Sequence, residues 1–292
     1  MQKKHTRDIH VDIANQTMSY IYKHIDTPIN INELASSFNV SKIHLHKIFK
    51  EQLGINIYEF IKSIRLQKAS NLLLTNKYST ITEVANMCGY SSQSSFIKAF
   101  KERFEQTPKE WRNGGYERYS DTIFKNSLLI DSLPNFDISK VRIVKMKDKT
   151  IFYIRQKGYI VEEAKQKWQQ LQALAYTNEL DDYEQIGIYH DNPAITPHPD
   201  CFYTAAISPL NQDIQLKTNL PSNTLEGGLY AAFDIYGGDR EVAWFVKWAY
   251  HKWLPQSGFE TTTDHSYVIM YKNHFLDDNE IDATFYLPIR SI

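Results

Sequence analysis

The spacing of apolar residues changes its period once along the chain. Up to about residue 112, apolar positions recur every three or four residues, which is typical of amphipathic helices. Beyond residue 140, short runs rich in β-branched and aromatic residues alternate with two helical stretches. The pattern predicts an all-α domain over 1–112, a linker rich in polar residues and glycine over 113–140, and an α+β domain over 141–292.

The all-α part contains one pattern twice. Residues 31–41 match residues 81–91 at an offset of fifty, and after the turn the offset becomes fifty-one, as in Phe49 and Phe100. An internal repeat of this kind predicts two copies of one supersecondary unit. We expect seven helices in this part, and the helix over about 57–73 is expected to set the distance between the two units.

Each repeated position has a physical reason. The first helix of each unit is predicted to be capped by Asn30 with Glu33 and by Thr80 with Glu83, each glutamate reaching back to the backbone amide of the cap. Asn39 and Gly89 occupy the turn, where a positive φ is expected. The two units are therefore predicted to be helix-turn-helix motifs. A plain helical bundle is the alternative, but it would require neither the turn residue nor the small residue at Ala35 and Ala85.

Charge divides the chain in the same place. Residues 1–112 carry 16 Lys and Arg against 10 Asp and Glu, or +6, whereas residues 113–292 carry 17 against 24, or −7. A basic first part suits a phosphate backbone, which an acidic second part would avoid.

Membrane, secretion and metal features are not expected. No apolar run approaches the roughly 18 residues of a membrane span, and no apolar stretch follows the first five residues, so a cytoplasmic location is predicted. Cys88 and Cys201 fall in different domains and are expected to be reduced packing residues. The histidines near residues 44–46 and 190–201 match no zinc pattern, so neither a metal nor a cofactor is predicted.

Residues 9–112 resemble the DNA-binding domain of the AraC/XylS family of transcription regulators. The resemblance rests on 41–50, on the linking helix through Arg65, on Gly89-Tyr90 leading into 96–101, and on the closing segment 107–112. It implies sequence-specific binding of double-stranded promoter DNA, with RNA polymerase as a partner. Two recognition helices on one face of DNA would lie about one helical turn apart, roughly 34 Å.

In that family, exposed residues of both recognition helices touch base edges. The corresponding positions are Ile43, His46, Lys47, Gln93, Ser94, Ile97 and Lys98. Lysine can donate to guanine, glutamine can pair with adenine, and isoleucine can pack on a thymine methyl group. The lysines expected at phosphates are Lys42, Lys50 and Lys101.

The second part is predicted to contain the order strand, helix, strand, strand twice, with helices over about 161–176 and 239–254 and the next-to-last strand over 267–272. This order gives an α+β domain of two related halves with a cleft between them. It resembles the GyrI-like effector-binding domain over about 141–290. The matching segments are Gly187 to Pro193, Gly227 to Phe233, Trp253 to Glu260, and the closing Tyr286-Leu-Pro-Ile.

One departure bears on the effector. Members of that family that bind organic cations commonly carry a glutamate where this chain has Ile269. We therefore expect a small, apolar or neutral ligand in an aromatic cleft, with ordinary core packing as the alternative for each residue. The expected ligand-binding residues are Tyr153, Trp168, Tyr189, Tyr230, Trp244, Ile269 and Tyr271.

Three functions follow from these patterns. The favoured one is a ligand-responsive, sequence-specific transcription regulator. The second is a DNA-binding protein whose C-terminal domain serves for partner contact or sequestration. The third is a hydrolase on the GyrI-like fold, but the sequence offers no convincing pair of nucleophile and base, so the chain is not predicted to be an enzyme.

Overall fold

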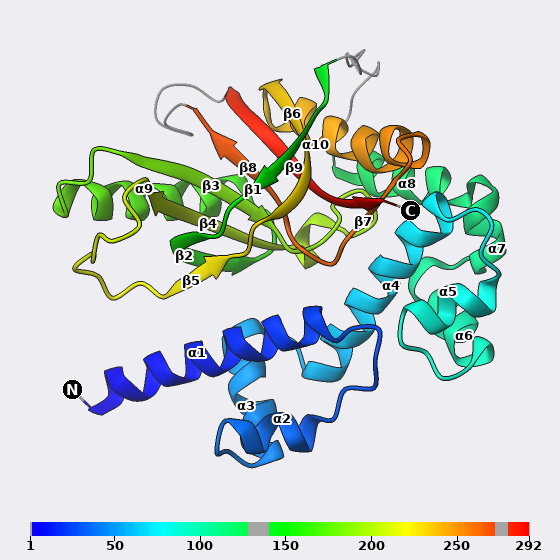
Figure 1. The fold of residues 1–292 in the computed structure, drawn as a ribbon, viewed down its shortest axis with the longest axis horizontal. Helices are drawn as coiled ribbons and strands as arrows, with labels where there is room; N and C mark the ends of the chain where they lie inside the picture. Colours follow the sequence, from blue (N-terminus) through cyan, green and yellow to red (C-terminus); the bar gives the residue numbers. More distant parts are fainter. Residues whose placement is uncertain (1, 128–139, 272–279, 292) are drawn as a thin grey trace. The chain divides into compact units, whose positions relative to one another are not determined.

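The computed structural model describes residues 2–127, 140–271 and 280–291 of the chain (Figure 1). The chain divides into two compact units, Met1–Gly115 and Tyr116–Ile292. The fold has the two predicted classes, a helical first unit and a second unit built on a curled antiparallel sheet with helices.

The first unit consists of helices and short turns. Their bounds are α1 Gln2–Lys23, α2 Ile31–Ser37, α3 Lys42–Leu53, α4 Ile57–Thr75, α5 Ile81–Met87, α6 Gln93–Phe104 and α7 Pro108–Glu110. A π-helical turn at Trp111–Gly115 ends the unit, with non-helical backbone at Asn113 and Gly114. The pairs α2 with α3 and α5 with α6 are the two predicted helix-turn-helix motifs.

The predicted caps and turns are present with one difference. Thr80 and Glu83 form a complete capping box at the start of α5. Asn30 caps α2 through its side-chain oxygen, but Glu33 accepts from the Asn30 side-chain amide at 2.7 Å and not from its backbone amide. Asn39 and Gly89 have φ values of 56° and 73°, which confirms the left-handed turn in both motifs.

The second unit contains one large antiparallel sheet. Its strands are β1 Arg142–Met146, β2 Lys149–Lys157, β3 Tyr183–Tyr189, β4 Phe202–Pro209, β5 Ser222–Leu225, β6 Gly228–Gly237, β7 Phe259–Thr261, β8 Ser266–Met270 and β9 Ile281–Ser291. The order across the sheet is β1-β6-β9-β8-β3-β4-β2-β5, with β7 paired to β9. The helices are α8 Tyr116–Ser127, α9 Val161–Thr177 and α10 Asp239–Trp248, and a π-helical turn at Ala249–Trp253 follows α10.

The predicted repeat is confirmed as β2-α9-β3-β4 and β6-α10-β8-β9. Short strands β5 and β7 were not predicted, and the helix expected to reach Leu254 ends as α10 at Trp248. The predicted strand over 267–272 corresponds to β8, and its last residue, Lys272, lies outside the described residues.

The ends of the sheet are drawn together by short connections. Two residues join β1 to β2 and two join β5 to β6, although each pair lies at opposite ends of the strand order. The Gly227 amide donates to the Asp148 carboxylate at 2.7 Å and ties these two connections together. The sheet therefore curls, with a helix-covered face and an inner face.

Part of the predicted linker is helical. Residues 116–127 form α8, which is joined to α10 by the ion pair of Asp121 with Lys247 and to the π-helical turn after α10 by the ion pair of Glu117 with Lys252, each at 2.5 Å. The ring of Phe124 lies 5.0 Å from that of Trp244. This segment therefore belongs to the second unit, while residues 128–139 lie outside the described residues.

Candidate functional site

The second helix of each motif, α3 or α6, begins at a serine cap. Ser41 Oγ accepts from the His44 amide at 3.1 Å, and Ser92 Oγ accepts from the Ser95 amide at 3.2 Å. One side of each helix is buried in the core of the first unit. The core residues are Leu45, Ile48, Phe49 and Leu53 in α3, and Phe96, Phe100 and Phe104 in α6. The opposite side of each helix is thereby left for contact with another molecule.

All ten residues predicted to contact DNA lie outside this core. Ile43 is 83% exposed. Two more are half-buried, His46 and Ile97, and the others are exposed, namely Lys42, Lys47, Lys50, Gln93, Ser94, Lys98 and Lys101. The local fold thus places residues of both predicted classes on the open sides of α3 and α6.

His46 lies in a small group of rings and charges. Its ring centroid is 5.2 Å from that of Tyr58, and Lys42 Nζ is 5.8 Å from the Tyr58 centroid. Burial, and then the charge of Lys42, lower the pKa of His46 below its ordinary value. The imidazole is therefore neutral at pH 7, with one donor nitrogen and one acceptor nitrogen.

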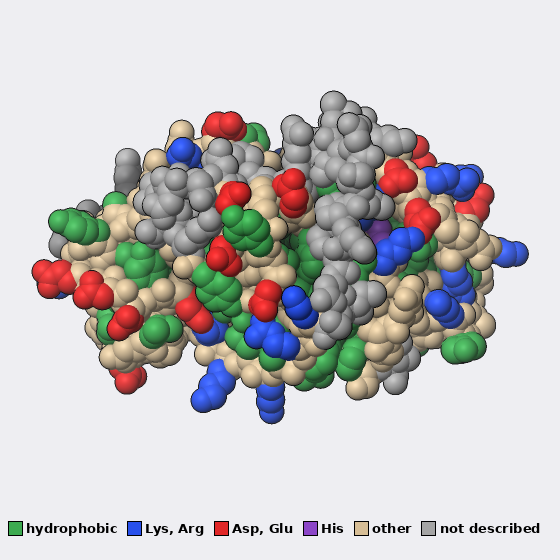
Figure 2. Space-filling model, turned by 90° about the horizontal axis from the view of Figure 1, so that it is seen from above, with side chains coloured by type: hydrophobic (Ala, Val, Ile, Leu, Met, Phe, Trp, Pro, Cys, Tyr) green, Lys and Arg blue, Asp and Glu red, His purple; other side chains and the backbone are tan. Residues whose placement is uncertain are grey.

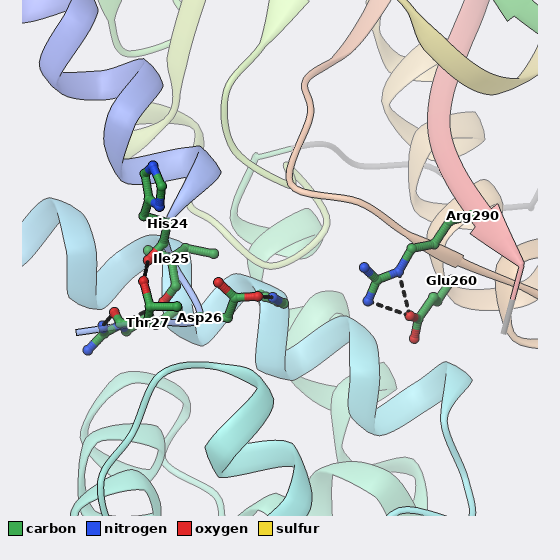
Figure 3. Close-up of polar contacts among 8 residues, drawn as sticks. His24, Ile25, Asp26, Thr27, Glu260 and Arg290 are labelled. Carbon is green, nitrogen blue, oxygen red and sulfur yellow. Dashed lines mark hydrogen bonds and ion pairs between the residues drawn. The ribbon is translucent and has the colours of Figure 1, made fainter. Parts of the chain in front are cut away.

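Arg65 of α4 connects the two motifs. Its guanidinium donates to the carbonyls of Ile25 at 3.0 Å and of Thr27 at 2.8 Å, in the segment that leads into α2. Lys68, also in α4, lies 3.7 Å from the Asp26 carboxylate. Ile25, Asp26 and Thr27 of this segment are labelled in Figure 3. A Cβ placed on Gly89 would lie 2.8 Å from Arg65 Nη2, so the turn of the second motif fits closely against the same side chain. Arg65 thus sets the position of both motifs on α4.

The inner face of the curled sheet carries a cluster of tyrosines. The rings of Tyr230 and Tyr267 meet edge to face at 5.2 Å, and those of Tyr267 and Tyr286 stack at 4.9 Å. Tyr153 and Ile269 are buried in the same cluster. Burial raises the pKa of Tyr286 to about 12 and raises those of Tyr230 and Tyr267 as well. These groups are therefore protonated phenols at neutral pH.

An ion pair lies on the same inner face. Lys149 Nζ is 2.5 Å from Glu184 Oε2, and the two side chains are 18% and 22% exposed. Side chains alternate between the faces of a strand, so Lys149 shares a face with Tyr153, and Glu184 shares one with Ile186 and Ile188 of the tyrosine cluster. The pair spans strand β4, which separates β2 from β3 in the sheet.

Comparison with known proteins matches each of the two units to a family model. A model described as a GyrI-like small molecule binding domain matches residues 139–290, which is more than half of the chain. The chain belongs to the GyrI-like family. A helix-turn-helix domain model matches residues 34–114, and the first unit is of the AraC type.

Curated relatives of this GyrI-like protein match about a third of the chain. The xylose operon regulatory protein of Escherichia coli is 37% identical over 98 residues, which cover 34% of this chain and 25% of that protein. The Msm operon regulatory protein of Streptococcus mutans is 34% identical over 99 residues, covering 34% of this chain and 35% of that protein. A solved AraC-type transcriptional regulator from Chromobacterium violaceum is 26% identical and covers 36% of this chain and 92% of that chain, with a TM-score of 0.33. The matches to the two curated relatives span about a quarter to a third of their lengths.

The GyrI-like unit does not bring the seven predicted ligand-binding residues together. Tyr153, Tyr230 and Ile269 lie in the inner cluster. Trp168 of α9 and Tyr189 of β3 pack in the core on the helix-covered face. Neighbouring residues of a strand point to opposite faces, so Tyr189 lies on the face opposite to that of Ile188. Trp244 contacts Phe124 of α8, and Tyr271 is exposed with its hydroxyl 2.5 Å from that of Thr284.

Four residues of the inner face are not among the predicted ligand-binding residues, namely Tyr267, Tyr286, Lys149 and Glu184. The period-two alternation of β3 carried a signal for one of them, since it places Glu184 on the side of Ile186 and Ile188. Ile186 pairs with Ile269 in the sheet, so Glu184, two residues before Ile186 on β3, lies one step along the same face from Ile269.

The described residues lack two kinds of feature. They contain no group of three His, Cys, Asp or Glu side chains that could hold a metal ion. None of their helices has the length and apolar character needed to cross a membrane. Acidic side chains lie along the side of the second unit where α9 is found (Figure 2).

Proposed function

We propose that this protein is a transcription regulator that binds a specific promoter sequence in double-stranded DNA through α3 and α6. The observation that carries the proposal is the pair of serine-capped helices, each with a buried apolar side and an open side with residues suited to base edges and phosphates. The basic charge of residues 1–112 supports contact with a phosphate backbone.

The proposed reading mode needs one copy of the chain. Two helices about one helical turn apart, roughly 34 Å, would read successive segments of the major groove, so the site would be asymmetric. The base readers are Ile43, His46, Lys47, Gln93, Ser94, Ile97 and Lys98, and the phosphate contacts are Lys42, Lys50 and Lys101. RNA polymerase is the proposed protein partner at the promoter.

The second unit is proposed to sense a small, neutral or largely apolar molecule on the inner face. Three observations support this ligand class. Ile269 contributes apolar contact, the tyrosines are uncharged phenols, and Lys149 neutralises Glu184. Binding would change DNA affinity or polymerase contact if the ligand binds one state of the protein better than another.

Selection of bound duplexes from a random library, with the full-length protein at moderate salt, tests the DNA part. Enrichment of two unlike segments about one helical turn apart is the expected result. Failure to enrich any sequence would overturn the regulator proposal. If DNA is bound specifically but no small molecule changes that binding, the second unit instead serves for partner contact or sequestration.

A further inference from the structure

We propose that Lys149 and Glu184 form the polar end of the effector site and select a flat, uncharged ligand with a donor and an acceptor side by side, such as a primary aromatic carboxamide. This inference rests on the proposed effector-sensing role of the inner face. It names the part of the ligand that the apolar residues of that face leave unspecified.

The pair lies where a ligand on the tyrosine cluster would meet it. Glu184 is on the face of Ile186 and Ile188, and Lys149 is on the face of Ile151 and Tyr153. Burial and then the neighbouring tyrosines raise the pKa values of Tyr267 and Tyr286, and the charge of Glu184 adds a smaller contribution in the same direction. Tyr286 is half-buried, and the two charged groups are each about one-fifth exposed, so this end of the cluster is open to solvent.

Two ion pairs flank the tyrosine cluster. Glu184 is paired with Lys149, and on the other side of the cluster Asp234 is paired with Arg142. A ligand cation would have to displace Lys149 from Glu184, and a ligand anion would have to displace Glu184 from Lys149. Either exchange leaves one charged group of the protein without its partner in a partly desolvated place, which costs free energy.

A carboxamide avoids that cost. Its carbonyl oxygen accepts from the Lys149 ammonium and its N–H donates to the Glu184 carboxylate, so both charged groups keep a charge-assisted hydrogen bond. The attached aromatic ring would contact Tyr286 and the tyrosines behind it. The pair thus favours a neutral polar group over either charge.

Three probes of nearly the same shape test this selection. We would titrate 2-naphthamide, the cation 2-naphthamidine and the anion 2-naphthoate into the full-length protein by calorimetry at neutral pH, without DNA. The wild-type protein is expected to bind the amide about tenfold more tightly than either charged probe. Lys149→Met should shift the preference to the amidine, and Glu184→Gln should shift it to the naphthoate.

Lys247→Met is the matched control. Lys247 forms an ion pair of the same length, 2.5 Å, with Asp121 and is 12% exposed, but it lies between α8 and α10. This variant should keep the wild-type order of the probes. Each inner-face variant has its own expected shift in probe preference. If only one of them folds, that variant is sufficient for the test.

Three results would overturn the inference. They are a wild-type preference for a charged probe, equal binding of all three probes with no change in the variants, and no binding of any probe to any variant. None of these involves DNA, so the regulator proposal would still stand or fall on the duplex selection. Equal binding would retain the inner face as a small-molecule site while removing the Lys149–Glu184 pair from it.

Discussion

Thr82 donates its hydroxyl hydrogen to the amide oxygen of Gln93, with 2.9 Å between the two oxygens. Thr82 belongs to α5 and Gln93 is the first residue of α6, so the bond crosses the second helix-turn-helix motif. The bond turns the Gln93 amide oxygen toward α5, so the amide presents its two N–H donors on the other side. Donors alone suit acceptor edges such as guanine N7 and O6 or thymine O4, whereas the adenine pairing suggested by residue type needs the oxygen as well.

Replacing Thr82 with valine tests this orientation. Thr82→Val keeps the branched shape and removes the hydroxyl, so Gln93 can turn and offer its oxygen. We expect the base preference at that position to broaden toward adenine, with a loss of about 1 kcal/mol on the original sequence. Competition among duplexes altered at single positions measures both effects. Thr122→Val, which removes a hydroxyl bonded inside α8, is the control, and unchanged preference in Thr82→Val would refute the proposed orientation.

The lysines of α3 and α6 should separate into two classes. Lys47→Ala or Lys98→Ala is expected to cost about 1 to 3 kcal/mol on the selected sequence and to relax one base position. Lys50→Ala should weaken binding to all sequences about equally and reduce the salt dependence by about one unit of slope. The measurement is binding to matched and altered duplexes over a range of salt concentrations.

Loss of the Lys47 ion pair should not disturb the fold, and the chain offers a control lysine. Lys47 lies 3.9 Å from Glu51 in an exposed pair, which contributes little to stability and is easily released. Lys77→Ala, at an exposed position outside both helices, is the control and should leave binding unchanged. Uniform losses in Lys47→Ala, Lys98→Ala and Lys50→Ala would mean that the base-reading positions are assigned incorrectly.

Local features of the first unit could be predicted from sequence because each depends on a few adjacent residues. The caps at Asn30 and Thr80 and the left-handed turns at Asn39 and Gly89 are of this kind. The contacts of Arg65 with the carbonyls of Ile25 and Thr27 join residues about forty positions apart. Such a contact leaves no periodic pattern in the sequence. The contacts by which Arg65 positions the two motifs were therefore seen only in the structure.

In the second unit, sequence predicted the order of elements better than the site. Alternation shows which residues of one strand share a face, but not which faces of different strands meet. The predicted ligand site therefore contains aromatic residues from opposite faces of the sheet, such as Tyr153 and Tyr189. The polar composition of residues 116–127 predicts a linker, but they form helix α8, in which Tyr116, Ser120, Ile123 and Phe124 follow helical spacing and are buried or half-buried.

Gly89 offers a stability test of the close fit to Arg65. In Gly89→Ala the new Cβ would lie 2.6 Å from the Ile25 carbonyl and would also require a positive φ. Gly54 has a similar φ of 69° but no atom within 4 Å of a built Cβ, so Gly54→Ala isolates the backbone effect. We expect about 1 kcal/mol of destabilisation for Gly54→Ala and about 2 to 4 kcal/mol for Gly89→Ala, measured by urea unfolding. Equal losses would show that the turn has room to adjust.

A buried histidine should make the second unit sensitive to acid. Burial, followed by the charges of Lys247 and Lys252, lowers the pKa of His251 to about 3. The unfolded chain has the ordinary value of 6.5, so between about pH 6.5 and pH 3 it binds more protons than the folded chain. The free energy of unfolding is therefore unaffected by protonation of His251 above pH 6.5, and it decreases as the pH falls from about 6.5 to about 3.

His251→Phe should reduce this pH dependence. A phenyl ring can keep the edge-to-face contact with Tyr116, whose ring lies 5.1 Å away, but it has no proton to bind. We expect the drop in unfolding free energy between about pH 7.5 and about pH 4.5 to be smaller in the variant than in the wild-type protein. His44→Phe, at an exposed position of α3, should retain the wild-type drop in urea unfolding followed by tryptophan fluorescence. If His251→Phe retains the full drop as well, burial of this ring does not cause the acid sensitivity.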